Sequence, residues 1–246
     1  MTADHTTLVL AALTFVLAGL VKGVTGMGLP TVAIGLLGLV MAPDEAAALL
    51  VISSTVTNIW QFVAGSYLVL RRMAWLLVTS SVVTYAAAGL LTGAGTSSAG
   101  AALGVALLAY AILGLSGLTV SVPPRLEPVL SPMIGALTGL AAGVTGVFVL
   151  PAAPYLQALG LGKEELVHAL GLSFTASTLA LAAGLARHGA FHIAVAGSSL
   201  LYTVPALIGM HIGQWGRARV DPATFRRLFF IALLILGADL AARAFA

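Results

Sequence analysis

Lys22 is a cation in an otherwise uncharged, glycine-rich stretch of the sequence, and this setting points to anion chemistry. It opens the run Lys22–Pro30, which contains three Gly and ends in Pro. Both residue types destabilise a helix interior, so the run predicts that a helix unwinds here. Unwound peptide N–H groups and the positive end of a helix dipole bind anions without help from side chains. The candidate anion-binding residues of this stretch are Lys22, Gly23, Thr25, Gly26 and Gly28.

The same glycine pattern returns later in the chain. Gly19–Gly26 recurs as Gly139–Gly146, at an offset of 120 residues, and the same offset relates the acidic pairs 44–45 and 164–165. We interpret the chain as a duplicated unit, with a first repeat at 1–120 and a second at 121–246. The second copy adds Gly143, Thr145 and Gly146 to the candidate anion site.

Uncharged polar side chains follow each glycine-rich stretch. Ser53, Thr57 and Gln61 recur at four-residue spacing, which places them on one helix face, and Asn58 lies beside that face. A polar face opposite an unwound segment is typical of a cavity lining, although a single Ser or Thr more often bonds its own helix carbonyl. The predicted substrate-lining residues are Asn58, Gln61, Ser173 and Thr175, and His211 is the candidate proton carrier because imidazole titrates near neutral pH.

The composition excludes most soluble functions for this chain. It has 246 residues, 60% hydrophobic and 8% charged, with a mean hydropathy of +1.09. Soluble domains carry about a quarter Asp, Glu, Lys and Arg, so this chain cannot cover a water-facing surface. The net charge of only +3 does not indicate a nucleic-acid partner, and with no Cys there is neither a disulfide nor a thiolate site. The composition is that of a polytopic membrane protein.

The uncharged runs indicate where the chain crosses the membrane. A crossing needs about 20 apolar residues, which predicts spans at 46–69, 74–92, 101–119, 165–186, 190–214 and 225–244. Two further apolar segments, 8–41 and 130–161, are interrupted by Gly and Pro. Each predicts a helix, a break and a short helix, either re-entrant or fully spanning, because unwound backbone at membrane depth must be buried or line a cavity. The predicted fold is an all-α polytopic membrane protein of two repeats, each a broken helix followed by three spans.

The positive charges favour an inverted arrangement of the two repeats. If the broken segments are re-entrant, all but three of the Lys and Arg residues share one face, as the positive-inside rule requires. Those on the shared face are Arg71, Arg72, Arg125, Lys163, Arg217, Arg219, Arg226 and Arg227, with Arg187 and Arg243 opposite.

Helix packing is the competing explanation for part of this pattern. The glycines of 135–143 and of 209–213 are spaced four apart, as in closely packed helix pairs, and Lys22 would snorkel to the interface if the break were shallow. No Walker sequence, nucleophile elbow or metal-ligand spacing is readable. Neither an enzyme nor a cofactor is predicted.

The sequence resembles the TauE/SafE family of bacterial membrane proteins, which are associated with sulfite and organosulfonate export. The resemblance is carried by the glycine-rich break, its second copy at Gly139–Gly146, the chain length and the acidic pair 44–45. The resemblance covers nearly the whole chain, although Met27–Pro30 departs from the denser glycine run of many members. It implies a secondary transporter that moves sulfite or a sulfonate across the inner membrane by alternating access. A passive anion channel with the same site and a carboxylate transporter are the alternatives. The expected partners are the small anion and the lipid bilayer, with a homodimer left open and no nucleic acid.

Overall fold

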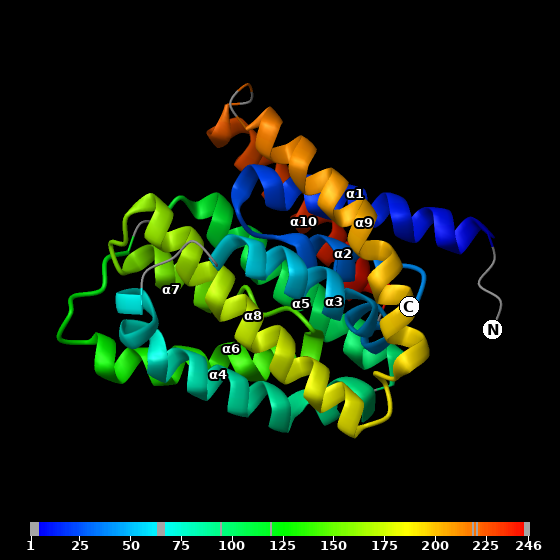
Figure 1. Cartoon of the computed structure of the whole chain (residues 1–246), viewed down its shortest axis with the longest axis horizontal. Coiled ribbons are helices and arrows are strands. Elements are labelled where there is room, and N and C mark those ends of the chain that lie inside the picture. The colour runs from blue at the N-terminus through cyan, green and yellow to red at the C-terminus, as the bar shows by residue number, and fades with distance from the viewer. Residues whose placement is uncertain are drawn as a thin grey trace.

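The computed structural model is built of α-helices throughout the residues that it describes, which are 5–62, 67–93, 95–118, 120–217, 219 and 221–243 (Figure 1). The all-α fold class predicted from the sequence is therefore confirmed. In chain order the helices are α1 (His5–Thr25), α2 (Leu29–Leu37), α3 (Pro43–Phe62), α4 (Tyr67–Gly93), α5 (Thr96–Ser116), α6 (Glu127–Thr145), α7 (Ala152–Ala158), α8 (Lys163–Arg187), α9 (Ile193–Gly216) and α10 (Pro222–Arg243).

Among the described residues, six helices are long and apolar enough to cross a bilayer: α1, α4, α5, α6, α8 and α9. Four of them correspond to the predicted spans 74–92, 101–119, 165–186 and 190–214, while α1 and α6 are the first arms of the predicted broken segments. Of the predicted span 46–69, α3 covers 46–62 and α4 begins at Tyr67, while 63–66 lie outside the described residues. Helix α10 corresponds to the span predicted at 225–244, whose last residue lies outside the described residues.

Glycines let two pairs of helices pack with their backbones in contact. On α1, Gly23 lies against the backbone of Met210 in α9, and on α6, Gly143 lies against Ala87 in α4. A Cβ at either glycine would overlap the neighbouring helix. The packing explanation for the glycine spacing is confirmed at these positions, and Gly135, Gly139, Gly209 and Gly213 make the same kind of contact.

The helices fall into two groups that run in opposite directions (Figure 1). Helices α1, α3 and α9 run together, and Ser53 of α3 bonds Thr203 of α9 at 3.1 Å. Helices α4, α6 and α8 run together the other way, and Ser80 of α4 lies 3.4 Å from Ser177 of α8. Helices α5 and α10 pack on each other, with Gly104 against Gly237.

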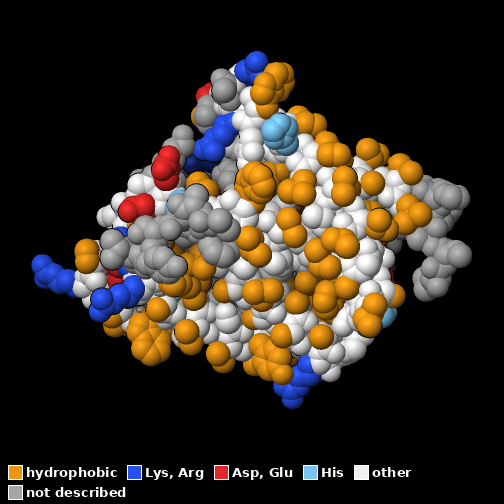
Figure 2. All heavy atoms as spheres, viewed as in Figure 1, with side chains coloured by type: hydrophobic (Ala, Val, Ile, Leu, Met, Phe, Trp, Pro, Cys, Tyr) orange, Lys and Arg blue, Asp and Glu red, His pale blue; other side chains and the backbone are white. Residues whose placement is uncertain are grey.

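The surface of the molecule separates apolar from charged side chains. Figure 2 shows hydrophobic side chains spread over the middle of the molecule, while Lys and Arg gather mainly at one end. Large apolar side chains such as Trp75, Leu201 and Ile235 are exposed on the helices. Because such a surface suits lipid rather than water, the chain is a multi-pass membrane protein. We call the charged end, where α9 ends and α10 begins, the cationic end; it carries Arg71, Arg72, Arg125, Arg217, Arg219, Arg226 and Arg227.

Two hairpins interrupt this arrangement, α1–α2 and α6–α7. Helix α2 has nine residues and α7 has seven, too short for either to cross a bilayer. The helix, break and short helix predicted for 8–41 and 130–161 are confirmed, but the first break is narrower than predicted. Lys22 and Gly23 remain helical, and only Gly26–Gly28 separates α1 from α2, because the contact of Gly23 with α9 continues the helix past Lys22.

Candidate functional site

The first break is formed by two glycines in the left-handed conformation. Gly26 has φ +81° and Gly28 has φ +100°, which side chains with a Cβ rarely adopt. The Gly26 N–H donates to the Lys22 carbonyl at 2.8 Å and so ends α1. The Thr25 hydroxyl donates to the Met27 carbonyl at 2.6 Å and accepts from the Met27 N–H at 3.2 Å. The threonine therefore fixes the turn that the glycines permit.

The second break begins in the same way. Thr145 ends α6, Gly146 follows with φ +73°, and its N–H donates to the Ala142 carbonyl at 2.8 Å. The Thr145 hydroxyl accepts from the Val147 N–H at 3.1 Å. The Gly-Val-Thr-Gly motif thus specifies one local geometry twice.

Lys22 is enclosed between α1 and α3. Its side chain is 1% exposed, and its Nζ donates to Asn58 Oδ1 and to Thr57 Oγ1, the latter at 3.1 Å. Asn58 Nδ2 donates in turn to Ser54 Oγ at 3.3 Å. Because the side chain does not reach the surface, the interfacial alternative for Lys22 is wrong. Within the described part of the chain Lys22 forms no ion pair, so neutral oxygens alone hold a buried cation.

Gln61 joins the polar face of α3 to the first break. Its Nε2 donates to the Gly26 carbonyl at 2.7 Å, while its Oε1 is buried and has no hydrogen-bond partner. The structure therefore brings together five of the predicted residues: Lys22, Thr25, Gly26, Asn58 and Gln61.

A small void separates α2 from the second break. Its lining includes Pro30 and Ile34 of α2, Ser54 of α3 and Gly146 of the second break. Its volume of about 10 Å³ is roughly that of one water molecule. The second break is closed in this structure, because Thr145, Val147 and Phe148 are all buried.

A much larger cavity, of about 780 Å³, lies on the other side of the first break. Thr25 and Met27 of the break form part of its wall, and Arg217 and Arg226 line it at the cationic end. We call it the entrance cavity. The first break is thus adjacent to an open cavity while the second is buried.

The other predicted residues, all of them described by the structure, form no hydrogen bond with the Lys22 side chain. Gly28 belongs to the first break, where it precedes α2 and lies against Val21, and Gly23 and Gly143 lie in helix contacts. Thr175 bonds the carbonyl of Gly171 in its own helix at 2.7 Å, whereas the Ser173 hydroxyl is buried with no partner. His211 is exposed on α9.

Several residues of the site were not among the predicted binding residues. Thr57 lies on the polar face of α3 predicted by its four-residue spacing but outside the predicted substrate-lining set, and it accepts a hydrogen bond from Lys22. Arg217, Arg226, Gln157 and Gln214 line the entrance cavity from three different helices and their connections, and no local pattern in the sequence relates them.

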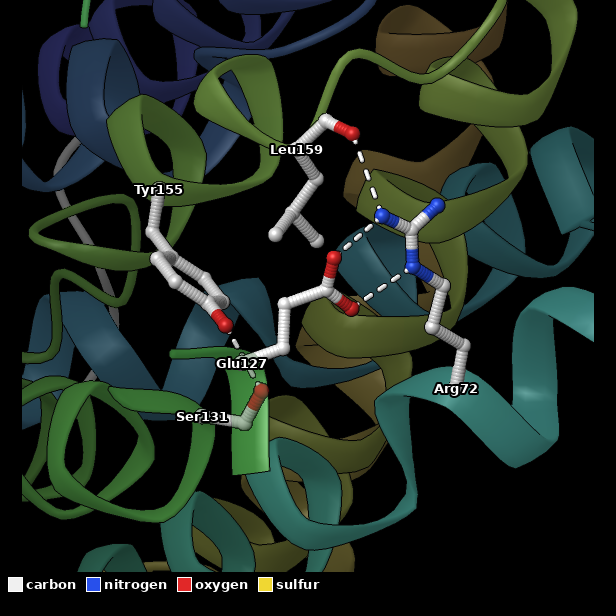
Figure 3. A network of polar contacts seen from close by, with 5 residues as sticks. All are labelled: Arg72, Glu127, Ser131, Tyr155 and Leu159. Carbon is white, nitrogen blue, oxygen red and sulfur yellow. Dashed lines mark hydrogen bonds and ion pairs between the residues drawn. The ribbon is translucent and has the colours of Figure 1, made fainter. Parts of the chain in front are cut away.

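A polar network fixes one wall of the entrance cavity (Figure 3). Arg72 of α4 binds Glu127 of α6 through two bonds, of 2.8 and 2.5 Å, and donates to the Leu159 carbonyl after α7 at 3.1 Å. Tyr155 of α7 bonds Ser131 of α6 at 2.7 Å. Because α7 also contributes cavity residues on its other side, this network holds the wall in place.

One comparison with known proteins gives a match. A family model described as Sulfite exporter TauE/SafE matches residues 11–240. No curated protein and no solved structure matches significantly.

Proposed function

Because the chain belongs to the sulfite exporter TauE/SafE family, we propose that it is a secondary transporter that moves sulfite or an organosulfonate across the inner membrane by alternating access. The family is one of transporters and not of enzymes. The proposal adds to the family membership a substrate, a site and a mechanism.

The observation that carries the proposal is the burial of Lys22 with neutral partners only. An uncompensated cation inside a membrane segment is costly, and such residues are commonly functional. Its Nζ bonds Asn58 and Thr57 in the structure. An anion that reached Lys22 from the first break would replace a neutral oxygen with a negative charge, which strengthens the interaction.

The proposed substrate site combines both breaks with polar residues of the neighbouring helices. At the first break these are Thr25, Gly26 and Gly28 with Lys22 of α1 and Asn58 and Gln61 of α3, and at the second they are Thr145 and Gly146 with Ser173 of α8. The unpartnered oxygens of Gln61 and Ser173 could accept from a bound water or a protonated anion. Gly23, Gly143, Thr175 and His211 are left out, because they pack helices, bond their own helix or lie exposed.

We further propose that the repeats 1–120 and 121–246 have inverted topology. Two observations support this: α1 packs along α9 as α6 packs along α4, and the two pairs run in opposite directions (Figure 1). The positive-inside rule places the cationic end in the cytoplasm. The open cavity at the first break and the closed second break then correspond to an inward-facing transporter.

Sulfite counterflow into proteoliposomes tests the role of Lys22. Lys22→Met keeps the side-chain length and removes the charge, so we expect counterflow to fall by about 30-fold or more. The variant removes a costly buried charge but leaves Asn58 Oδ1 without its donor, so thermal unfolding in detergent is measured first to show that Lys22→Met is folded. Arg187→Gln, an exposed site at the opposite end, is the matched control and should transport like the wild type. Wild-type counterflow by Lys22→Met would overturn the proposed site.

The same vesicles separate a carrier from a channel. A carrier shows saturable counterflow, whereas a passive channel shows single-channel currents and no counterflow. Currents without counterflow would refute alternating access while leaving the anion site intact.

A further inference from the structure

The entrance cavity is larger than a small oxyanion requires. Its volume of about 780 Å³ lies within the range of about 300–1,000 Å³ in which protein pockets enclose organic ligands. It borders the first break through Thr25 and Met27, whereas Lys22 lies behind that break and outside the cavity lining. The volume therefore calls for an explanation separate from Lys22.

One side of the entrance cavity is a rigid aromatic wall. Tyr110 of α5 meets Phe229 and Phe230 of α10 edge to face, with ring centroids 6.3 and 5.1 Å apart. The Tyr110 hydroxyl lies 3.2 Å from the Met27 sulfur, which joins this wall to the first break. Phe225 continues the wall toward the cationic end. Such a surface binds an apolar body through area burial and ring contacts.

The cationic end of the cavity carries positive charge that no described carboxylate neutralises. Arg217 is half-buried and Arg226 is exposed, both line the cavity, and neither forms an ion pair with a described residue. The nearest acid along the chain, Asp221, instead caps α10, where it accepts from the Thr224 hydroxyl at 2.6 Å and the Thr224 N–H at 2.9 Å. These bonds hold the pKa of Asp221 below its usual range, with the Thr224 hydroxyl bond as the main cause.

We infer that the entrance cavity is a second anion site, in front of Lys22, which selects organic anions. The anionic group lies at Arg217 and Arg226, and the apolar body lies along Phe225 and the wall of Tyr110, Phe229 and Phe230. Sulfite has no apolar body and gains nothing from the wall, so the wall sets the preference for an organic over an inorganic anion, while Arg217 and Arg226 hold the charged group. The inference rests on the proposed function, because it assigns a selectivity step to the same transport path.

Calorimetric titration of the full chain in phosphatidylcholine nanodiscs tests this. Benzenesulfonate and methanesulfonate share a charged group and differ in the apolar body, and benzenesulfonamide keeps the body without the charge. We expect benzenesulfonate to bind at least about tenfold more tightly than either. Phe225→Ala should remove most of the difference between the two sulfonates.

The arginines have a matched control in the same segment. R217Q/R226Q should weaken benzenesulfonate binding about tenfold or more and change sulfite binding less than about twofold. R219Q/R227Q removes the same charge from residues outside the cavity lining, one of which stacks on Trp215 at 3.8 Å, and should leave both affinities unchanged. Equal loss in both double variants would mean that only the general field of the cationic end matters, and would overturn the inference.

Two further outcomes are distinguishable. If the wild type binds benzenesulfonate through Arg217 and Arg226 but Lys22→Met leaves sulfite counterflow intact, the proposed transport site fails while the second site stands. The second outcome concerns phosphatidylglycerol nanodiscs. If this lipid abolishes benzenesulfonate binding to the wild type but does not change benzenesulfonate binding to R217Q/R226Q, a lipid headgroup occupies the arginines and the inference fails.

Discussion

At the scale of single residues, the contact of Lys22 with Asn58 defines the candidate site. The sequence predicts both residues, one as a charge in an apolar segment and the other beside a polar stripe. Their direct bond, and the bond of Lys22 to Thr57, could not be predicted. Those contacts depend on how α1 lies against α3, and α1 also packs through Gly23 on α9, which is far away in the sequence.

Substitutions of Asn58 distinguish a site that binds anions from one that is only structural. Asn58→Asp places a carboxylate against Lys22, so we expect the melting temperature to hold or rise while sulfite affinity falls about tenfold or more, because Lys22 is neutralised. Asn58→Leu instead removes an acceptor from a buried cation and should lower the free energy of unfolding by about 1–3 kcal/mol.

Thermal unfolding in detergent and calorimetric sulfite titration measure the two effects separately. Wild-type sulfite affinity in a stable Asn58→Asp variant would contradict the assignment of Lys22 to the anion.

At the scale of helices, the sequence predicts that two segments break and approximately where. The Gly-Val-Thr-Gly motif is a local signal, since Gly26 and Gly146 both adopt positive φ after a helix-ending Thr. The number of residues in each break is not determined by the local sequence. Gly23 looks like a helix breaker in the sequence but is helical in the structure, because a residue without a Cβ is what the contact with α9 requires.

Gly143→Ala tests this packing role. A Cβ there would overlap Ala87 of α4, so we expect a loss of about 1–3 kcal/mol in the free energy of unfolding from overpacking. Gly100→Ala is the control: Gly100 lies inside α5 with open space around it, and alanine there should be neutral or stabilising by up to about 1 kcal/mol. Equal melting temperatures for the two variants would mean that α4 and α6 are free to separate.

At the scale of the whole molecule, the internal repeat and the distribution of Lys and Arg along the chain together predict two groups of helices that run in opposite directions, with most of the positive charge at one end. The entrance cavity was beyond prediction, because its lining comes from α1, α5, α7, α9 and α10, and no local pattern in the sequence specifies how these helices pack. The structure has an open cavity beside the first break and a buried second break, and the network of Arg72, Glu127 and Leu159 is found beside the second hairpin only, within the described residues.

The duplication predicts where the opposite cavity would open. Gln157 of α7 lines the entrance cavity and is exposed, and its counterpart 120 residues earlier is Leu37 of α2, which is 1% exposed. If the halves exchange roles during transport, Leu37 must line a cavity on the other face. The chain contains no Cys, so single cysteines can be introduced directly. We expect a membrane-impermeant maleimide to label Gln157→Cys from the cationic side only and Leu37→Cys from the opposite side only.

The labelling rates of Gln157→Cys and Leu37→Cys should also change in opposite directions under any condition that shifts the population between the two conformations of the carrier. Sulfite applied on one side, or Glu127→Gln, which weakens the network beside α7, should raise one rate and lower the other, because a two-state carrier cannot expose both positions in the same molecule. A channel would expose both at once, and a rigid protein would never expose Leu37. Leu37→Cys that stays unlabelled under turnover would therefore exclude the exchange of the two halves, whatever the substrate proves to be.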